Sequence, residues 1–148
     1  MLKLVGDNKT RSLGLQKCAA AVSKPARMRE MTVLCADPVH ERLSRLTNAL
    51  RKCGFLVWEA DCASRCVSIA ASQKPEGVVL DLDLLHVDME NIAEYVCRVS
   101  PASRVILTVD DLSLWRTTPP YVAAVAARES DGQIMFLLQE MFLTDHQA

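Results

Sequence analysis

The chain has 148 residues, of which 50% are hydrophobic and 24% are charged, and its formal net charge is -1. This length suits one domain with its own core, and this composition is typical of a soluble globular protein. No apolar run approaches the roughly 20 residues of a membrane-spanning helix. The first residues lack the apolar stretch of a secretory signal, so we expect a cytoplasmic protein without a membrane partner.

Charge and cysteine are distributed unevenly. Residues 1–30 carry seven basic and two acidic side chains, which predicts a basic, flexible N-terminal arm ahead of a domain over residues 31–145. Such an arm could bind nucleic acid, but only weakly and without sequence preference. The six cysteines form no CxxC pair and lack histidines at ligand spacing, so we expect reduced thiols and no metal site.

The domain begins with a strand, a helix and a second strand. MTVLCA (31–36) is a short apolar run typical of a buried strand. Asp37 and Pro38 follow and favour a helix start, since aspartate caps free amides and proline suits the first helical position. The inward face of this helix is expected to carry Val39, Leu43, Leu46 and Leu50. Gly54 ends the helix, and FLVWEA (55–60) is the second strand.

The middle of the domain repeats this alternation. A second helix follows Asp61 and ends before Pro75. Its packing face is expected to contain Ala63, Cys66, Val67 and Ala70. GVVLDL (77–82) is the third strand, and residues 89–99 form a third helix. The inward residues of that helix are expected to be Ile92, Val96 and Val99.

The last part of the domain contains two more strands and one more helix. RVILTV (104–109) is the fourth strand, and residues 110–120 leave room for a short helix at most. YVAAVAA (121–127) is the fifth strand, and residues 132–143 form the last helix. This helix is expected to bury Ile134, Leu137, Leu138 and Met141.

The five expected strands are continuously apolar and alternate with helices. Continuous apolar strands are typical of a parallel sheet that is covered on both faces. The fold class is therefore α/β, with a five-stranded parallel sheet in a three-layer α/β/α sandwich. Ligands of such sheets gather beyond the carboxyl ends of the strands. The side chains expected at this edge are Asp37, Asp81, Asp83, Thr108, Asp110 and Arg128.

The chain from residue 31 to about 143 resembles the receiver domains of bacterial response regulators, which have a flavodoxin-like fold. EGVVLDLDLLHVDM is similar to their third strand, where an aspartate accepts a phosphoryl group, and this resemblance points to Asp81. VILTV is similar to their fourth strand, where a serine or threonine senses the phosphoryl group, which points to Thr108. ADPVHERLSRLTNALRKCGFLVWEAD is similar to their first helix and second strand.

Two parts of the receiver chemistry are missing. The resemblance implies two adjacent acids ending the first strand as Mg²⁺ ligands, and these positions are occupied by Cys35 and Ala36. Asp37 comes next, as a possible metal ligand or as a helix cap. The resemblance also implies a lysine from the fifth strand, but the last lysine of the chain is Lys74, which leaves Arg128 as a possible substitute.

These losses predict a degenerate receiver. Without metal or lysine, a phosphorylated Asp81 would face repulsion from Asp37, Asp83 and Asp110. The first hypothesis is therefore a pseudo-receiver, not an enzyme and without cofactor, that acts in signal transduction through protein–protein interaction. The alternative is a single-domain response regulator that is phosphorylated on Asp81 with Mg²⁺. Nucleic-acid binding through the basic arm is a second alternative.

The partner expected for a pseudo-receiver is a protein, either a histidine kinase or another regulator. The last helix carries more apolar residues than its core stripe needs, so it is a candidate interaction surface that also allows a homodimer. The residues proposed for this surface are Trp115, Met135, Phe136 and Phe142. Trp115 belongs to the weakly patterned segment and could instead be a lid over the fourth strand.

Overall fold

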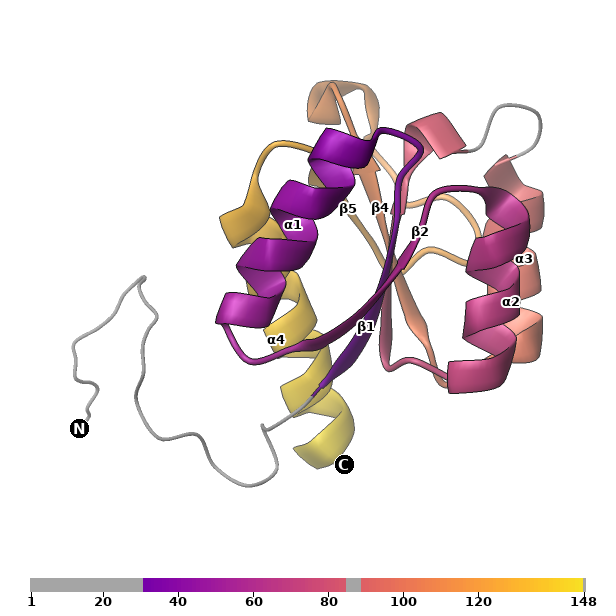
Figure 1. Cartoon of the computed structure of the whole chain (residues 1–148). Coiled ribbons are helices and arrows are strands. Elements are labelled where there is room, and N and C mark those ends of the chain that lie inside the picture. Colours follow the sequence, from indigo (N-terminus) through magenta and orange to yellow (C-terminus); the bar gives the residue numbers. More distant parts are fainter. Residues whose placement is uncertain (1–30, 85–88, 148) are drawn as a thin grey trace.

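The computed structural model describes residues 31–84 and 89–147, and it contains one parallel five-stranded sheet. The strands are β1 (Thr32–Ala36), β2 (Leu56–Ala60), β3 (Gly77–Asp81), β4 (Arg104–Val109) and β5 (Ala124–Ala127). Their order in the sheet is β2-β1-β3-β4-β5, so β3 is central (Figure 1). The predicted α/β class and the parallel sheet are confirmed. The basic arm predicted for residues 1–30 lies outside the described residues.

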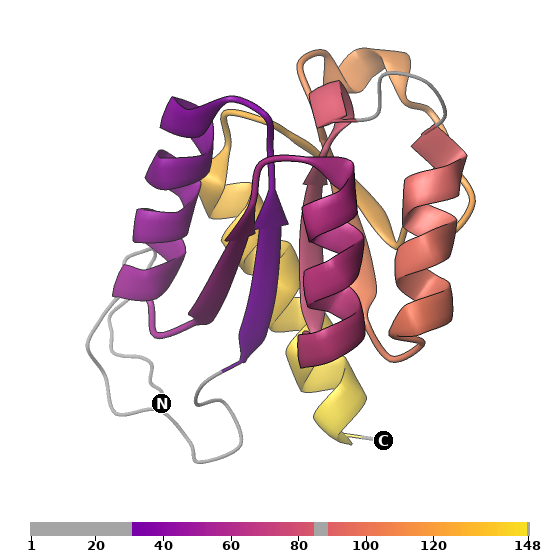
Figure 2. The same ribbon diagram turned by 45° about the vertical axis from the view of Figure 1, so that its right-hand side comes forward.

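Four helices cover the two faces of the sheet, and Figure 2 shows the resulting layers. They are α1 (His40–Lys52), α2 (Ala63–Gln73), α3 (Met89–Val99) and α4 (Asp131–Gln147). α1 and α4 pack on one face, and α2 and α3 pack on the other (Figure 1). Among the described residues, no helix combines the length and the hydropathy needed to cross a bilayer.

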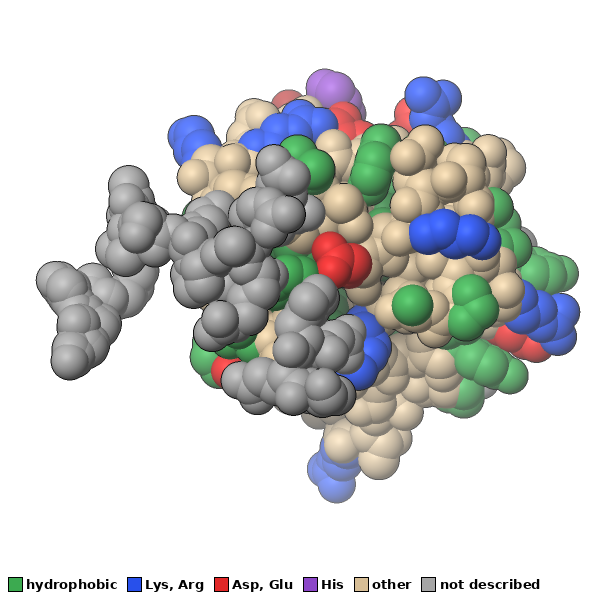
Figure 3. Space-filling view, turned by 90° about the horizontal axis from the view of Figure 1, so that it is seen from below, with side chains coloured by type: hydrophobic (Ala, Val, Ile, Leu, Met, Phe, Trp, Pro, Cys, Tyr) green, Lys and Arg blue, Asp and Glu red, His purple; other side chains and the backbone are tan. Residues whose placement is uncertain are grey.

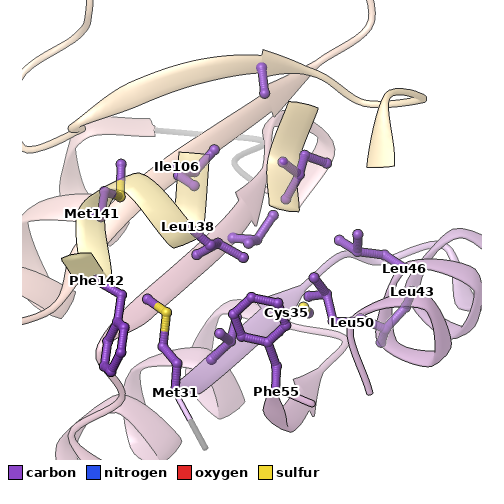
Figure 4. Packing of buried hydrophobic residues seen from close by; sticks show 14 residues of the cluster. Met31, Cys35, Leu43, Leu46, Leu50, Phe55, Ile106, Leu138, Met141 and Phe142 are labelled. Carbon is purple, nitrogen blue, oxygen red and sulfur yellow. The ribbon is translucent and has the colours of Figure 1, made fainter. Parts of the chain in front are cut away.

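The sheet separates two hydrophobic clusters. The α1/α4 side contains the residues labelled in Figure 4, among them Leu43, Leu46 and Leu50 from α1 and Leu138 from α4. The predicted stripe of α1 is confirmed except at Val39, which is 40% exposed because the helix begins one residue later. On the other side, the buried helix residues are Cys66, Ala70, Ala93 and Val96. Ile92 and Val99 are only partly buried there, because Ala93 and Val96 face the sheet more directly.

The connection between β4 and β5 contains only a 3-10 turn, η3 (Leu112–Leu114), in agreement with the weak pattern of this segment. The fifth strand was predicted to begin at residue 121, but β5 begins at Ala124. Tyr121 follows two prolines and has a left-handed backbone with φ of 66°. Neither feature fits an extended strand.

Gly77 marks the close approach of α4 to the start of β3. A Cβ atom built on Gly77 would lie 2.7 Å from Cδ2 of Leu138, which is fully buried. We expect Gly77→Ala to lower the free energy of unfolding by roughly 1–3 kcal/mol, because the overpacked core must shift. Chemical denaturation would measure this. Gly132→Ala is the control, since its Cβ atom meets nothing within 4 Å.

Thr47 places a polar group in the core of the α1 side. The residue is fully buried, and its Oγ1 has no hydrogen-bond partner within the part of the chain that the structure describes. Its polar neighbour is the Cys35 thiol, whose pKa burial raises and the Thr47 hydroxyl partly lowers, and a thiol is too weak a hydrogen-bonding group to replace a full partner. We expect Thr47→Val to raise the free energy of unfolding by about 1 kcal/mol, because the unpaired hydroxyl is removed at nearly constant shape. A lower denaturation midpoint in this variant would contradict the expectation.

Candidate functional site

Six polar side chains meet at the carboxyl edge of the sheet, at the top of the view in Figure 1. Their residues are Asp37 after β1, Arg42 in the first turn of α1, Asp81 at the end of β3, Asp83 in the 3-10 turn η2 (Leu82–Leu84), Thr108 in β4 and Arg128 after β5. The sheet register pairs Asp81 directly with Thr108. Parallel strands bring these residues to one edge, although they are up to 91 positions apart in the chain.

Asp81 is the centre of this cluster and is 1% exposed. Its Oδ2 accepts hydrogen bonds from Nε of Arg128 at 2.8 Å and from Oγ1 of Thr108 at 2.9 Å. Its Oδ1 accepts from Nη2 of Arg128 at 3.0 Å, from the backbone amide of Asp83 at 2.9 Å and from Nη2 of Arg42 at 3.3 Å. A carboxylate offers about four lone-pair sites, so these five donors saturate it.

Arg128, the residue predicted as a substitute for the missing lysine, lies against Asp81. Its backbone amide continues the sheet pairing by donating to the carbonyl of Val109 at 2.7 Å. This contact fixes the chain where β5 ends, and the guanidinium then forms the bidentate pair described above. The hydrogen bond to Asp81 raises the pKa of Arg128 further above its ordinary value, despite an opposing effect of burial.

Arg42 was not among the predicted site residues. Its Nη2 lies 2.9 Å from Asp37, 3.3 Å from Asp81 and 2.9 Å from Asp83, so one nitrogen atom contacts three carboxylates. Its Nε donates to Oδ2 of Asp37 at 3.1 Å. The hydrogen bond to Asp37 is the largest influence that raises the pKa of Arg42. The guanidinium is therefore a permanent positive charge.

Asp37 supports the start of α1 without being its N-cap residue. The N-cap residue is Val39, whose backbone amide donates to Oδ1 of Asp37 at 2.8 Å. This contact between residues i and i+2 is an Asx turn. Pro38 therefore precedes the helix, whereas it was predicted to occupy the first helical position. Oδ1 and Oδ2 of Asp37 also accept from Arg42. Both oxygens are thus engaged within the protein.

Cys35 and Ala36, the predicted positions of the lost metal acids, lie inside β1. Their side chains belong to the two hydrophobic clusters on opposite faces of the sheet. Burial strongly raises the pKa of the Cys35 thiol, so the thiol stays protonated at neutral pH. The first side chain after β1 that joins the polar cluster is Asp37. The residues that follow β1 at the carboxyl edge of the sheet are therefore Asp37 and Pro38, while Cys35 and Ala36 lie in the core.

The carboxylates do not fit a divalent cation of the kind that receiver chemistry requires. Mg²⁺ needs oxygen ligands at about 2.0–2.1 Å in an octahedral shell. No group of acidic, histidine or cysteine side chains suited to a metal occurs within residues 31–84 and 89–147. The point between the three carboxylates is taken by Nη2 of Arg42. A divalent ion at this point would have to displace this guanidinium group.

The repulsion expected around a phosphorylated Asp81 stays a prediction. In the structure, three carboxylates and two guanidinium groups share this space. Arg42 and Arg128 both contact Asp83 as well as Asp81. Asp110 is exposed. The carboxylates of the cluster are therefore paired with the protein's own cations, Arg42 and Arg128.

The four residues predicted for an interaction surface differ in exposure. Phe136 on α4 is 59% exposed. Met135 is half-buried against the α1/α4 cluster, where the Cys53 thiol lies 3.3 Å from its sulfur atom. Trp115 is half-buried against the other cluster. Phe142 is 5% exposed and belongs to the core (Figure 4), so its assignment to an exposed surface was wrong.

The thiols outside the site differ in expected reactivity. Hydrogen bonds from Ser64 and the backbone lower the pKa of Cys62, which is fully exposed. Burial raises the pKa of Cys66 to about 12. Because the thiolate is the reactive form, we expect iodoacetamide at pH 8 to label Cys62 first among the described cysteines. Cys35 and Cys66 should react only after unfolding, as peptide mass spectrometry with a Cys62→Ser control would show. Equal labelling of Cys66 in the folded protein would contradict this.

At the opposite end of the molecule, the charged side chains of the described residues are scattered. Figure 3 shows this end, where Lys and Arg side chains of the described residues stand apart among acidic and hydrophobic ones. The described surface on this side is therefore of mixed charge. The basic arm, on which the nucleic-acid alternative rests, lies outside the described residues.

Comparisons with known proteins agree with this architecture at the level of the fold. No protein-family model and no curated protein matches the sequence. A CheY-like response regulator receiver domain protein from Methanospirillum hungatei is 12% identical with a TM-score of 0.68, over 80% of this chain and 98% of that one. The signal receiver domain of an HD domain-containing protein from Pseudomonas fluorescens is 18% identical with a TM-score of 0.68, over 81% and 100%.

A third solved structure is a response regulator protein from Burkholderia pseudomallei with a phosphorylated aspartic acid, calcium ion and citrate. It is 14% identical with a TM-score of 0.63, over 80% of this chain and 71% of that one. The TM-scores of 0.63 to 0.68 show that this chain shares its fold with all three neighbours. The chain therefore has the fold of response-regulator receiver domains.

Proposed function

We propose that this protein is a pseudo-receiver, which acts in signal transduction through protein–protein contacts and does not use Mg²⁺-dependent phosphorylation of Asp81. The observation that carries this proposal is the saturation of the Asp81 carboxylate by five hydrogen-bond donors. An aspartate can attack phosphorus only with a free oxygen lone pair. Here the attacking oxygen, whichever of the two it is, would first have to give up its hydrogen bond from Arg128.

The arginine pair also changes the electrostatics of phosphoryl transfer. Receiver chemistry needs a metal ion that neutralises charge on the transferring oxygens. A guanidinium group held by three carboxylates has its charge already compensated, so Arg42 is poorly placed to take over that role. Arg128 is bound to Asp81 in the resting state, and its fork cannot reproduce a compact lysine ammonium at the same point. Both features oppose the reaction.

Thr108 supports a signalling state that does not depend on phosphorylation. In the receivers that this chain resembles, the equivalent residue senses the phosphoryl group. Here its hydroxyl donates directly to Asp81 at 2.9 Å. Arg128 ties the end of β5 to the same carboxylate. We propose that this arrangement holds the β4, β5 and α4 side of the domain in one permanent form, which a protein partner recognises.

The partner is proposed to be a histidine kinase or another regulatory protein, or a second copy of this chain. Phe136 on α4, which is 59% exposed, is the residue of the predicted surface that best fits a contact. Receiver domains are generally signalling modules, and the described residues around Asp81 contain no pairing of a nucleophile with a base. A non-enzymatic role follows from these features as part of the proposal.

A phospho-accepting response regulator is the second candidate. It is favoured by the position of Asp81 at the end of β3, with Thr108 paired beside it in the sheet. Phosphorylation would require Arg128 to swing away from the carboxylate and a cation to displace Arg42. Both candidate functions are compatible with the fold, and they differ in whether Asp81 is phosphorylated.

The test is intact-mass spectrometry after incubation with acetyl phosphate and Mg²⁺. We expect no phosphoryl adduct on the wild-type chain, because the nucleophile is saturated. Asp81→Asn is the control for adducts at other residues. An adduct on the wild type that is absent from Asp81→Asn would refute the pseudo-receiver proposal and establish the second candidate.

A further inference from the structure

The Arg42 side chain has a geometry that ion pairing at a protein surface does not require. A surface ion pair joins one cation to one carboxylate, whereas Nη2 of Arg42 lies within 3.3 Å of Asp37, Asp81 and Asp83. The three carboxylates come from the ends of β1 and β3 and from η2, so they surround one point at the sheet edge. The side chain is 21% exposed.

We infer that Arg42 is an internal replacement for a divalent cation: it neutralises the carboxylates of Asp37, Asp81 and Asp83 and thereby excludes metal ions from this edge. This inference extends the proposed function, because it explains how the carboxylates at the carboxyl edge of the sheet are neutralised without Mg²⁺. It concerns cation binding, which is measured without any phosphodonor, and so it can fail or succeed independently of phosphorylation.

The distances indicate why the guanidinium and a metal exclude each other. The three oxygens lie at 2.9, 3.3 and 2.9 Å from Nη2, which suits N–H donors. Divalent cations need the same oxygens at about 2.0–2.6 Å. An ion at this point would have to displace the guanidinium, because both occupy the space between the carboxylates. Without Arg42, the three carboxylates would lose the guanidinium nitrogen that contacts all of them.

Two neutral replacements of Arg42 test this prediction. We expect Arg42→Ala and Arg42→Gln to bind Mn²⁺ with a dissociation constant on the order of 10⁻³ M or tighter, in the range of weak carboxylate sites. The wild type should bind at least tenfold more weakly. Electron paramagnetic resonance of free Mn²⁺ measures binding, and thermal unfolding with Ca²⁺ against NaCl of equal ionic strength measures the linked gain in stability.

Three control variants separate this effect from loss of any arginine. Arg42→Lys retains a cation and should stay as insensitive to Mn²⁺ as the wild type. Arg45→Ala removes a neighbouring arginine of α1 that contacts Asp131 and the carbonyl of Arg128, and it should gain no binding. Adding Asp83→Asn to Arg42→Ala should abolish the gain, because one of the three ligands is lost.

The possible results are decisive in both directions. Mn²⁺ binding by a neutral variant, with its loss on Asp83→Asn, supports the inference. If the neutral variants are unfolded alone but fold when Mn²⁺ is added, that outcome supports it too. Binding by the wild type as tight as by Arg42→Ala would overturn the inference. So would neutral variants that bind no Mn²⁺, whether folded or unfolded.

Discussion

Replacing Arg128 with alanine is expected to lower the free energy of unfolding by roughly 3–5 kcal/mol. The variant removes the bidentate partner of Asp81, whose side chain is 2% exposed, and leaves a buried carboxylate with too little compensation. Small domains have total stabilities of about 5–15 kcal/mol, so this is a large share. Urea denaturation followed by circular dichroism would measure the loss, and the midpoint of thermal unfolding should fall by more than about 10 °C.

Arg98→Ala is the matched control for this variant. Arg98 also pairs with a carboxylate, at 2.5 Å from Glu94, but its side chain is 66% exposed. Exposed pairs of this kind contribute about 0.3–0.5 kcal/mol. Equal losses in the two variants would contradict the claim that burial makes the Arg128 pair important.

A second substitution at Asp81 distinguishes the buried charge from simple loss of packing. Arg128→Ala with Asp81→Asn is expected to be more stable than Arg128→Ala alone, because the uncompensated carboxylate is gone. Neighbouring residues commonly show coupling energies of about 0.5–3 kcal/mol. If the losses from the two substitutions simply added, the charge would not be the cause.

Much of the fold could be predicted because it depends on hydrophobic patterning. The continuous apolar runs identified all five strands, and β1 and β4 match their predicted runs to within one residue. β5 was predicted three residues too long, because Tyr121 and Val122 extend an apolar run. The two preceding prolines and the left-handed backbone of Tyr121 indicate a turn instead. Local backbone geometry therefore outweighed hydrophobicity at that point.

The candidate site could be predicted only where its residues end strands. Asp81, Thr108 and Arg128 follow apolar runs, so their common edge is visible in the sequence. Arg42 lies within a helix, where a charged residue is normally assigned to solvent. Its position in the first turn, four residues before the buried Leu46, was a usable signal. That spacing places it above the inward face, at the end of the helix nearest the site.

Counting residues shows that lysine is absent after Lys74, and this count led to Arg128 as a substitute. It does not reveal Arg42, the second cation of the site. Replacement depends on side-chain length and direction, since a guanidinium on α1 reaches carboxylates that follow β1 and β3. The contacts of Arg42 with Asp81 and Asp83 join segments 39 and 41 positions apart, which a local pattern does not reveal.

Phe142→Glu is expected to cost at least about 4 kcal/mol of stability and to leave most of the protein unfolded. Phe142 is 5% exposed, and it continues the buried stripe of α4 one turn beyond Leu138. The substitution removes an aromatic ring from the core, which alone costs about 3–5 kcal/mol when the residue is truncated. It also places a carboxylate where no polar partner is expected. Circular dichroism and denaturation would show the loss.

Phe136→Glu is the informative partner of that variant. The Phe136 side chain is 59% exposed, so its replacement should change the free energy of unfolding by no more than about 0.5 kcal/mol. If α4 forms the contact proposed for a protein partner, this variant should lose binding or dimerisation while keeping wild-type stability. Size-exclusion chromatography with light scattering would test the dimer. If Phe142→Glu loses partner binding and Phe136→Glu does not, the loss reflects unfolding of the Phe142 variant. Binding retained by Phe136→Glu would exclude α4 as the contact.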